Sequence, residues 1–127
     1  MSRVLLDTSV LIGAATLDEL EGAISAPSLA ELYFGVLVAA DQDERGRRAH
    51  RLGLIEATFD PLPLDARVAR EWGRLAAAVA QRGAQPRRRV MDLAIAATAN
   101  VHGVPLLTHD TADLAVIGDL VTLLDAA

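Results

Sequence analysis

Short apolar runs alternate with helix-like patterns along this 127-residue chain, and this alternation constrains the fold more than any other feature of the sequence. Runs of strand length are expected at residues 3–6, 105–108 and 121–124, with a weaker one at 22–26. Helical patterns are expected at residues 8–15, 28–40, 41–58, 65–82, 90–102 and 112–117. Residues 59–64 read as an edge strand or extended link, and residues 83–89 as a loop. Strands that alternate with helices predict an α/β fold, a three-layer α/β/α sandwich around a mostly parallel sheet, formed as one domain over residues 1–127.

The composition indicates a globular protein of the reducing cytoplasm. Hydrophobic residues make up 52% of the chain and charged residues 23%, which is enough to build a packed core. Cysteine is absent, so disulfides and thiolate metal sites are excluded. Asp7 ends the first apolar run too soon for a signal peptide, and no apolar segment approaches the roughly 18 residues that a membrane span needs. We therefore expect a cytoplasmic protein without a membrane segment.

Charge is distributed unevenly along the chain. All twelve basic residues are arginines, and eleven of them lie between Arg45 and Arg89 together with only four acidic residues, which gives this segment a net charge of +7. The rest of the chain holds one arginine and thirteen acidic residues. An acidic cleft rimmed by arginine suits a metal-dependent enzyme that acts on a polyanion, although arginines on helix surfaces are also ordinary solvated charges.

Four acidic residues stand where an apolar run gives way to a loop or to the start of a helix: Asp7, Glu31, Asp92 and Asp110. An ionised carboxylate beside apolar surface is costly unless it is paired or binds a metal, and the chain has no lysine to neutralise it. Sites in parallel α/β folds form at the carboxyl ends of strands, where Asp7 and Asp110 are expected. The sequence therefore predicts a divalent-cation site.

The four acidic residues belong to four motifs that follow one another along the chain. The motifs are Leu6-Asp7-Thr8-Ser9-Val10-Leu11-Ile12, Ser28-Leu29-Ala30-Glu31-Leu32, Asp92-Leu93-Ala94-Ile95-Ala96-Ala97-Thr98-Ala99 and Leu107-Thr108-His109-Asp110-Thr111-Ala112-Asp113-Leu114. In these motifs the chain resembles PIN-domain ribonucleases, and among them the VapC toxins of prokaryotic toxin–antitoxin pairs. The resemblance implies a metal-dependent endoribonuclease that acts on structured RNA, is inhibited by a cognate VapB-like antitoxin and forms a homodimer. A catalytically silent PIN-like module that binds RNA or protein is the alternative, which the presence of all four acids disfavours.

Carboxylates are hard oxygen ligands, so the expected cofactor is Mg²⁺ or Mn²⁺, which would stabilise charge on the scissile phosphate and activate water. We expect Asp7 and Asp92 to bind the ion directly. Glu31 and Asp110 would hold its waters or a second ion. Asp113 is the alternative to Asp110 as the fourth acid, and the two can also act together.

Several polar residues near these motifs have supporting roles in this interpretation. Ser9 and Thr108 match polar positions of the family motifs and could orient a carboxylate or a phosphate, although helix capping alone would also explain them. The run of Arg87, Arg88 and Arg89 lies directly before the motif of Asp92 and could contact RNA phosphates, or could simply be a solvated loop.

Two of the acids also have purely structural interpretations. Ser28 and Glu31 have the spacing of a capping box, in which Ser28 begins a helix and Glu31 reaches back to its first turn. Asp92 could complement the positive end of its own helix. The three histidines lack a zinc-like spacing, and His109, next to Asp110, is expected to point to the opposite face of an extended strand.

The absence of lysine and the apolar helix surfaces bear on the enzyme class and on the expected partner contacts. The absence of lysine disfavours P-loop enzymes, receiver domains and haloacid-dehalogenase-like phosphatases, which all normally use one. Trp72, at helical spacing within 65–82, is expected in the core or at a homodimer contact. The apolar surface of the helices at 28–40 and 41–58 is the expected groove for the antitoxin segment, which would place a basic side chain near Asp7 and Asp92.

Overall fold

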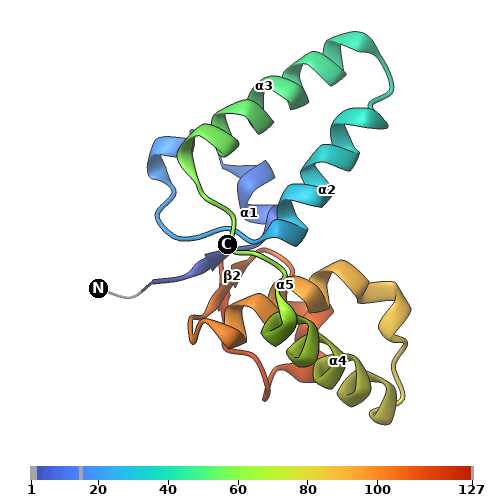
Figure 1. Ribbon diagram of the computed structural model, residues 1–127. Helices are drawn as coiled ribbons and strands as arrows, with labels where there is room; N and C mark the ends of the chain where they lie inside the picture. The colour runs from blue at the N-terminus through green and yellow to red at the C-terminus, as the bar shows by residue number, and fades with distance from the viewer. Residues whose placement is uncertain (1–2, 15, 127) are drawn as a thin grey trace.

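The computed structural model describes residues 3–14 and 16–126. Its strands are β1 (Leu5–Leu6), β2 (Leu106–Thr108) and β3 (Leu123–Asp125). Its α-helices are α1 (Thr8–Gly13), α2 (Ala26–Leu37), α3 (Gln42–Thr58), α4 (Ala66–Gln81) and α5 (Val90–Val101). Three 3₁₀ helices complete it: η1 (Leu17–Glu19), η2 (Pro86–Arg89) and η3 (Thr111–Ile117). The strands form one parallel sheet, as the sequence predicts, and their order in it is β1-β2-β3 (Figure 1).

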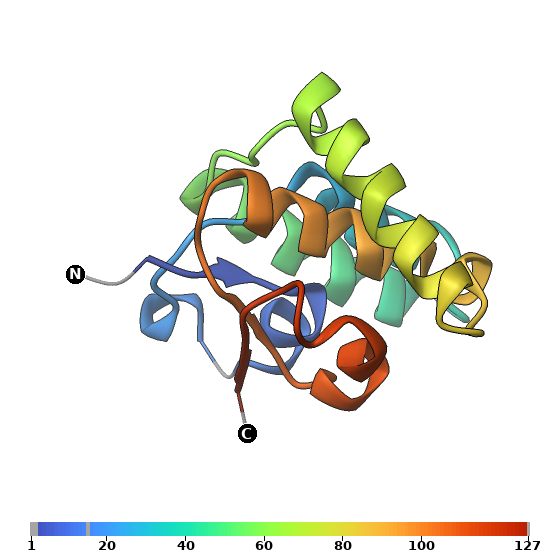
Figure 2. The ribbon, with the colours of Figure 1, turned by 90° about the horizontal axis from the view of Figure 1, so that it is seen from below.

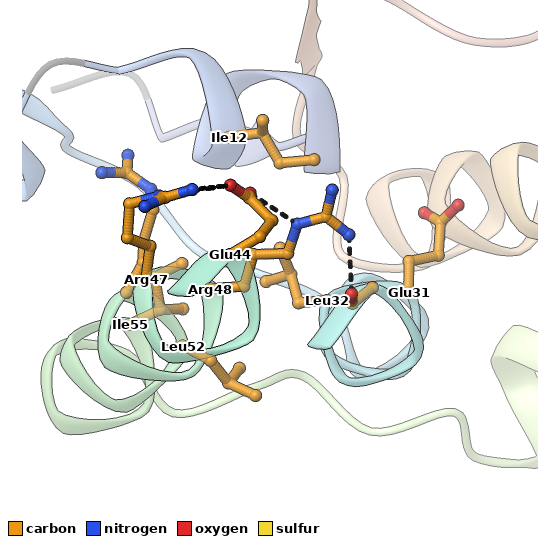
Figure 3. Close-up of a pocket in the computed structure, with 10 residues that line it drawn as sticks. Ile12, Glu31, Leu32, Glu44, Arg47, Arg48, Leu52 and Ile55 are labelled. Atoms are coloured by element: carbon orange, nitrogen blue, oxygen red, sulfur yellow. Dashed lines mark hydrogen bonds and ion pairs between the residues drawn. The ribbon is translucent and has the colours of Figure 1, made fainter. Parts of the chain in front are cut away.

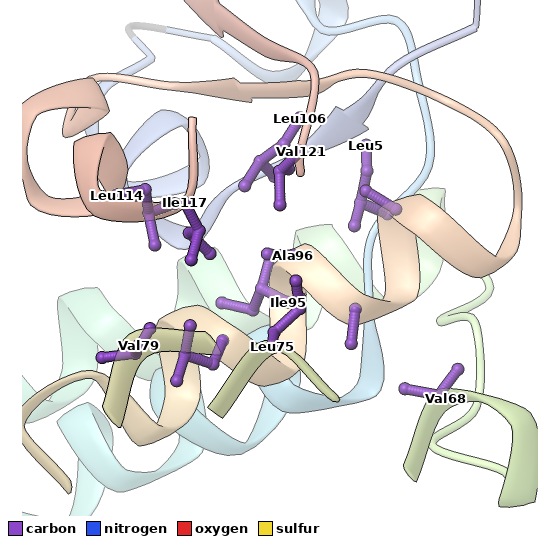
Figure 4. Packing of buried hydrophobic residues seen from close by; sticks show 13 residues of the cluster. Leu5, Val68, Leu75, Val79, Ile95, Ala96, Leu106, Leu114, Ile117 and Val121 are labelled. Atoms are coloured by element: carbon purple, nitrogen blue, oxygen red, sulfur yellow. The ribbon is translucent and has the colours of Figure 1, made fainter. Parts of the chain in front are cut away.

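Helices cover both faces of this small sheet. Neighbouring residues of a strand point to opposite faces, so Leu5 and Leu106 pack into one hydrophobic cluster, while Leu6 and Leu107 pack into another. The first cluster joins the sheet to α4, α5 and η3 (Figure 4). The second joins it to α1 and α3 on the other face, and the two helical layers lie on either side of the strands in Figures 1 and 2. This arrangement confirms the expected α/β/α sandwich.

Two of the expected extended segments form less structure than predicted. Residues 22–26 and 59–64 form no strand. They pair only through two isolated parallel bridges, of Ala23 with Leu5 and of Ser25 with Leu62. Pro61 and Pro63 have no backbone N–H, so the second segment cannot continue a ladder. The expected end of the first helix, Ala15, lies outside the described residues.

Helix α2 begins earlier than its sequence pattern suggests. Its N-cap is Ser25, whose hydroxyl accepts a hydrogen bond from Ser28 N at 3.2 Å, so the prediction that Ser28 caps this helix is wrong. Pro27 lies in the first turn, where a backbone N–H would have no acceptor within the helix, so the proline costs no helical hydrogen bond. Glu31 therefore lies six residues after the cap, twice the spacing of a capping box.

The apolar stripes of α2 and α4 behave differently. Val68, Leu75 and Val79 of α4 are fully buried, and Trp72 packs against the same core cluster, as expected for a core residue. On α2, by contrast, Tyr33 and Leu37 are 54% and 59% exposed. No helix in the part of the chain that the structure describes is both long and apolar enough to cross a lipid bilayer.

Candidate active site

Asp7 directly follows β1, at the carboxyl edge of the sheet, and serves as the N-cap of α1. Its buried carboxylate is held on one oxygen only: Oδ2 accepts hydrogen bonds from the hydroxyl of Ser9 at 2.7 Å and from that of Thr108 at 2.9 Å. The N-cap bond from Ser9 N, at 3.4 Å, also ends on Oδ2. The structure thus brings Ser9 and Thr108 into contact with the same oxygen of Asp7. Among the described residues, Oδ1 accepts no hydrogen bond and stays available to a ligand.

The same two hydroxyl groups join the carboxylate to the end of the neighbouring strand. Ser9 Oγ accepts a hydrogen bond from His109 N at 3.1 Å, and Thr108 Oγ1 accepts one from Asp110 N at 3.0 Å. Two hydroxyl groups therefore connect the Asp7 carboxylate to the backbone that follows β2. The His109 backbone, rather than its imidazole, carries this link.

Glu31 lies half-buried on α2 and reaches the first residue of α1, Thr8, whose hydroxyl donates to Glu31 Oε1 at 2.7 Å. Burial raises the pKa of Glu31 above its usual value, the Thr8 hydrogen bond lowers it, and the nearby charge of Asp7 raises it further. The capping-box interpretation of this residue fails, because the cap of α2 is Ser25. Glu31 is instead a second acid beside Asp7.

Asp92 is the residue on which the acidic cluster converges. It lies half-buried in the first turn of α5, and burial together with the charges of Asp7, Glu31, Asp113 and Asp110 raises its pKa from 3.8 to about 6. A helix N-terminus by itself would lower this pKa. The upward shift therefore comes from burial and from the neighbouring acids, and not from the helix dipole.

The last motif brings two acids to the same place. Asp110 follows β2, and Asp113 lies in the first turn of η3; both side chains are exposed. The charge of each acts on Asp92, that of Asp113 the more strongly. The structure thus brings together all five acids predicted from the sequence, and it does not separate Asp113 from the site.

The three consecutive arginines occupy a 3₁₀ turn, η2, rather than an irregular loop. Arg89 donates from Nε to the backbone oxygen of Asp113 at 2.5 Å, so it ties η2 to η3 beside the acids. Arg87 and Arg88 are exposed. Only these two of the three therefore present their guanidinium groups freely to solvent.

The chemistry of this donor set fits a hydrated divalent cation. Asp7 Oδ1 and Glu31 Oε2 accept no hydrogen bond within the described part of the chain, and the same holds for both oxygens of Asp92. Across residues 3–14 and 16–126, no three carboxylate or imidazole groups stand close enough to hold one ion by themselves. Mg²⁺ commonly keeps several waters and uses only one or two protein carboxylates, so this looser arrangement suits it.

A groove of about 450 Å³ lies between α1, α2 and α3, and Glu31 of the acidic cluster is one of its lining residues (Figure 3). Its lining is mostly apolar side chains and arginines: Ile12, Glu31, Leu32, Gly35, Glu44, Arg47, Arg48, Arg51, Leu52 and Ile55. Glu44 pairs with Arg47 and Arg48, which hold its two carboxylate oxygens. Glu31 belongs to both the groove and the acidic cluster, so an occupant of the groove would reach the site.

Sequence reasoning missed two residues of this site. Thr8 bonds Glu31, and Ser28 lies behind Thr8 with its hydroxyl 3.0 Å away. The available signal was a threonine directly after the first acid and a serine three residues before the second. The sequence pattern predicts Ser28 as a helix cap instead.

Comparison with known proteins places the chain in a family. The model of the PIN domain matches residues 4–119. Among relatives from Mycobacterium tuberculosis, ribonuclease VapC5 is 38% identical over 112 residues, covering 83% of this chain and 81% of the relative. Ribonuclease VapC4 is 37% identical over 125 residues, covering 93% of each chain.

A solved structure agrees with these sequence matches. A chain in the crystal structure of VapBC-5, a member of the VapBC family of toxin–antitoxin systems from Mycobacterium tuberculosis, superposes with a TM-score of 0.80 at 35% identity. The superposition covers 98% of both chains. The fold, the order of the four acidic motifs and these relatives agree, and the chain belongs to the PIN-domain family, in its VapC branch.

Proposed function

We propose that this chain is an endoribonuclease that requires Mg²⁺ or Mn²⁺ and acts as the toxin of a toxin–antitoxin pair. One observation carries the proposal: the charges of four other acids converge on Asp92, and no arginine or lysine of the described residues pairs with any of these five carboxylates. Such a cluster of negative charge is unfavourable unless a cation shares it. The relatives named ribonuclease VapC support the choice of RNA as the substrate.

Each residue has a distinct role in this proposal. Asp7 and Asp92 bind the ion, while Glu31 and Asp110, together with Asp113, hold its waters or a second ion. When bound, the cation supplies a Lewis acid for the scissile phosphate and lowers the pKa of water.

Orientation and substrate binding fall to neutral and basic residues. Ser9 and Thr108 fix Asp7 so that Oδ1 remains free for the ion. The exposed Arg87 and Arg88 contact RNA phosphates next to the site, whereas Arg89 keeps η3 in place.

The partner is a small VapB-like antitoxin, because the similar structure named above is described as a member of a toxin–antitoxin family. Its segment fills the groove between α1, α2 and α3, with apolar side chains over Ile12 and Leu32 and a basic side chain directed at Asp7 and Asp92. The protein acts in the cytoplasm as a homodimer. Exposed apolar side chains on α2, rather than α4 with its core residue Trp72, offer the larger surface for that contact.

Expression of the chain alone in its host tests the proposal. We expect growth arrest and cleaved RNA at protein levels verified by immunoblot, and relief of both when the neighbouring small gene is co-expressed. Asp92→Asn at equal level is the control and leaves growth unaffected. Normal growth with intact RNA would contradict the toxin function and favour a catalytically silent binding module.

A further inference from the structure

A chain of buried hydroxyl groups leads from the start of α2 to Glu31. Ser25 Oγ lies 3.2 Å from Ser28 Oγ, Ser28 Oγ lies 3.0 Å from Thr8 Oγ1, and Thr8 Oγ1 lies 2.7 Å from Glu31 Oε1. Ser25 and Ser28 are 0% exposed and Thr8 is 8% exposed. Water therefore has little access to these hydroxyl groups, and they must satisfy one another.

The donors in this chain can be assigned from the number of protons. A hydroxyl group carries a single proton, and an ionised carboxylate can only accept. Thr8 must therefore donate to Glu31, which leaves Ser28 as the donor to Thr8 and Ser25 as the donor to Ser28. All three O–H bonds point toward the carboxylate, and hydrogen bonds aligned in this way strengthen one another.

Thr8 and Asp7 are adjacent residues, so one short stretch of backbone sets the positions of two acids. The two carboxylates are held in the same manner: hydroxyl donors hold Asp7 Oδ2 and Glu31 Oε1, and the second oxygen of each accepts no hydrogen bond among the described residues. Neutral donors orient a carboxylate without cancelling its charge. An arginine or lysine would hold it as firmly but would compete with a cation.

We propose that Thr8 is the positioning residue of Glu31, fixing Oε1 through the buried hydroxyl chain so that Oε2 stays free for the waters of the cation that Asp7 and Asp92 bind. The inference rests on the proposed metal-dependent function. Thr8 itself touches neither cation nor substrate. Thr8 contributes by orienting the Glu31 carboxylate. Its own hydroxyl group is held in turn by Ser28, which contacts Ser25.

Thr8→Val and Thr8→Ser test this role, because valine keeps the shape of threonine without the hydroxyl and serine keeps the hydroxyl. Mn²⁺ binding to the metal-free protein is measured by titration calorimetry, and RNA cleavage is measured in parallel. We expect Thr8→Val to weaken Mn²⁺ binding and cleavage by about 10-fold or more, the usual effect of removing a residue that orients a ligand. Thr8→Ser should remain within about 3-fold of the parent.

Thr98→Val is the matched control, since Thr98 is equally buried and its hydroxyl bonds only Ala94 O within α5. Thr98→Val should change neither Mn²⁺ binding nor RNA cleavage.

A second experiment combines Thr8→Val with Glu31→Gln. If Thr8 acts through Glu31, the double variant should bind Mn²⁺ no more weakly than Glu31→Gln alone, whereas independent contributions would multiply.

Parent-like Mn²⁺ affinity and cleavage in Thr8→Val, or equal defects in Thr8→Val and Thr8→Ser, would overturn the role of Thr8 while leaving the nuclease proposal intact. A parent that binds Mn²⁺ but cleaves no RNA would overturn the nuclease alone, and the Mn²⁺ affinities would still decide the role of Thr8. A parent that binds no Mn²⁺ would contradict both. If Thr8→Val fails to fold, the double variant Ser28→Ala plus Glu31→Gln takes its place. Losses of Mn²⁺ affinity that multiply in this double variant, although Thr8→Ser binds Mn²⁺ like the parent, would contradict the hydroxyl chain.

Discussion

At the scale of single residues, the site consists of carboxylates oriented by neutral partners. Ser9 and Thr108 hold Asp7, Thr8 holds Glu31, and Asp92 has no hydrogen-bonding partner among the described residues. Burial and the neighbouring charges therefore disfavour the ionised form of Asp92, and they raise its pKa. These features give the site a measurable pH dependence.

The first prediction concerns the stability of the metal-free protein. Because folding raises the pKa of Asp92 from 3.8 to about 6, its neutral form is favoured in the fold, and this stabilising contribution is complete below about pH 4 and lost as the pH rises through 6. Glu31, whose pKa is also raised, acts in the same direction. We expect the melting temperature in EDTA to fall between about pH 4 and pH 7. Calorimetry should find a smaller fall in Asp92→Asn, and an unchanged profile would contradict the placement of Asp92.

The second prediction separates charge from structure at Glu31. In EDTA at pH 7, Glu31→Gln should melt at or above the melting temperature of the parent, because the side chain does not cap α2, the glutamine oxygen still accepts from Thr8, and the repulsion with Asp7 is removed. Cleavage should fall by about 10-fold or more, since a charge is missing from the site. Glu56→Gln, on an exposed position of α3, is the control. Parent-like cleavage by Glu31→Gln would remove Glu31 from the site.

At the scale of elements, the sequence patterns predicted helices better than extended segments. The helices expected at 41–58 and 65–82 form as α3 and α4, with Asp41 and Asp65 as their N-caps, because a side-chain acceptor before a helical run is a local signal. The start of α2 was misplaced since two serines, Ser25 and Ser28, both fit a cap and only the folded backbone distinguishes them. Isolated bridges at 22–26 and 59–64 depend on partners distant in the sequence, which no local pattern reveals.

One contact between elements carries a prediction of its own. Arg51 of α3 donates three hydrogen bonds to the last carbonyl groups of α1, two to Leu11 O and one to Ala14 O. Arg51→Met should lower the free energy of unfolding by about 1–3 kcal/mol, because it leaves partly buried acceptors unpaired. Arg47→Met, which breaks an exposed ion pair with Glu44, should cost clearly less than Arg51→Met, because water and salt screen that pair. Equal losses in urea denaturation would show that Arg51 does not fix α1.

At the scale of the whole molecule, the sandwich brings four distant motifs to one edge of a parallel sheet. The motifs and their order were readable from the sequence, and so was the set of acids that the fold gathers. The hydroxyl link from Thr8 to Glu31 was not, because it joins α1 to α2 across 23 residues and depends on how these helices cross.

The groove beside the site gives a prediction for the partner. Ile12 is 63% exposed at its edge, so Ile12→Asp should not disturb folding, yet it would place a charge against the apolar antitoxin segment. We expect antitoxin affinity, measured by calorimetry, to fall by about 10-fold or more. RNA cleavage should be retained. Leu54→Asp, on α3 but outside the groove lining, is the control, and equal affinity losses in the two variants would argue against the groove as the binding site.

Cleavage of total RNA by the purified chain, mapped at nucleotide resolution with Mg²⁺ or Mn²⁺ and with EDTA, tests the central claim most directly. The acidic cluster predicts defined cleavage sites that appear only with the divalent cation and disappear in Asp7→Asn and Asp92→Asn, both of which should still fold. Each variant replaces an anionic ligand by a neutral side chain of the same shape. Cleavage by either variant at the parent's rate, or cleavage by the parent in EDTA, would contradict the account.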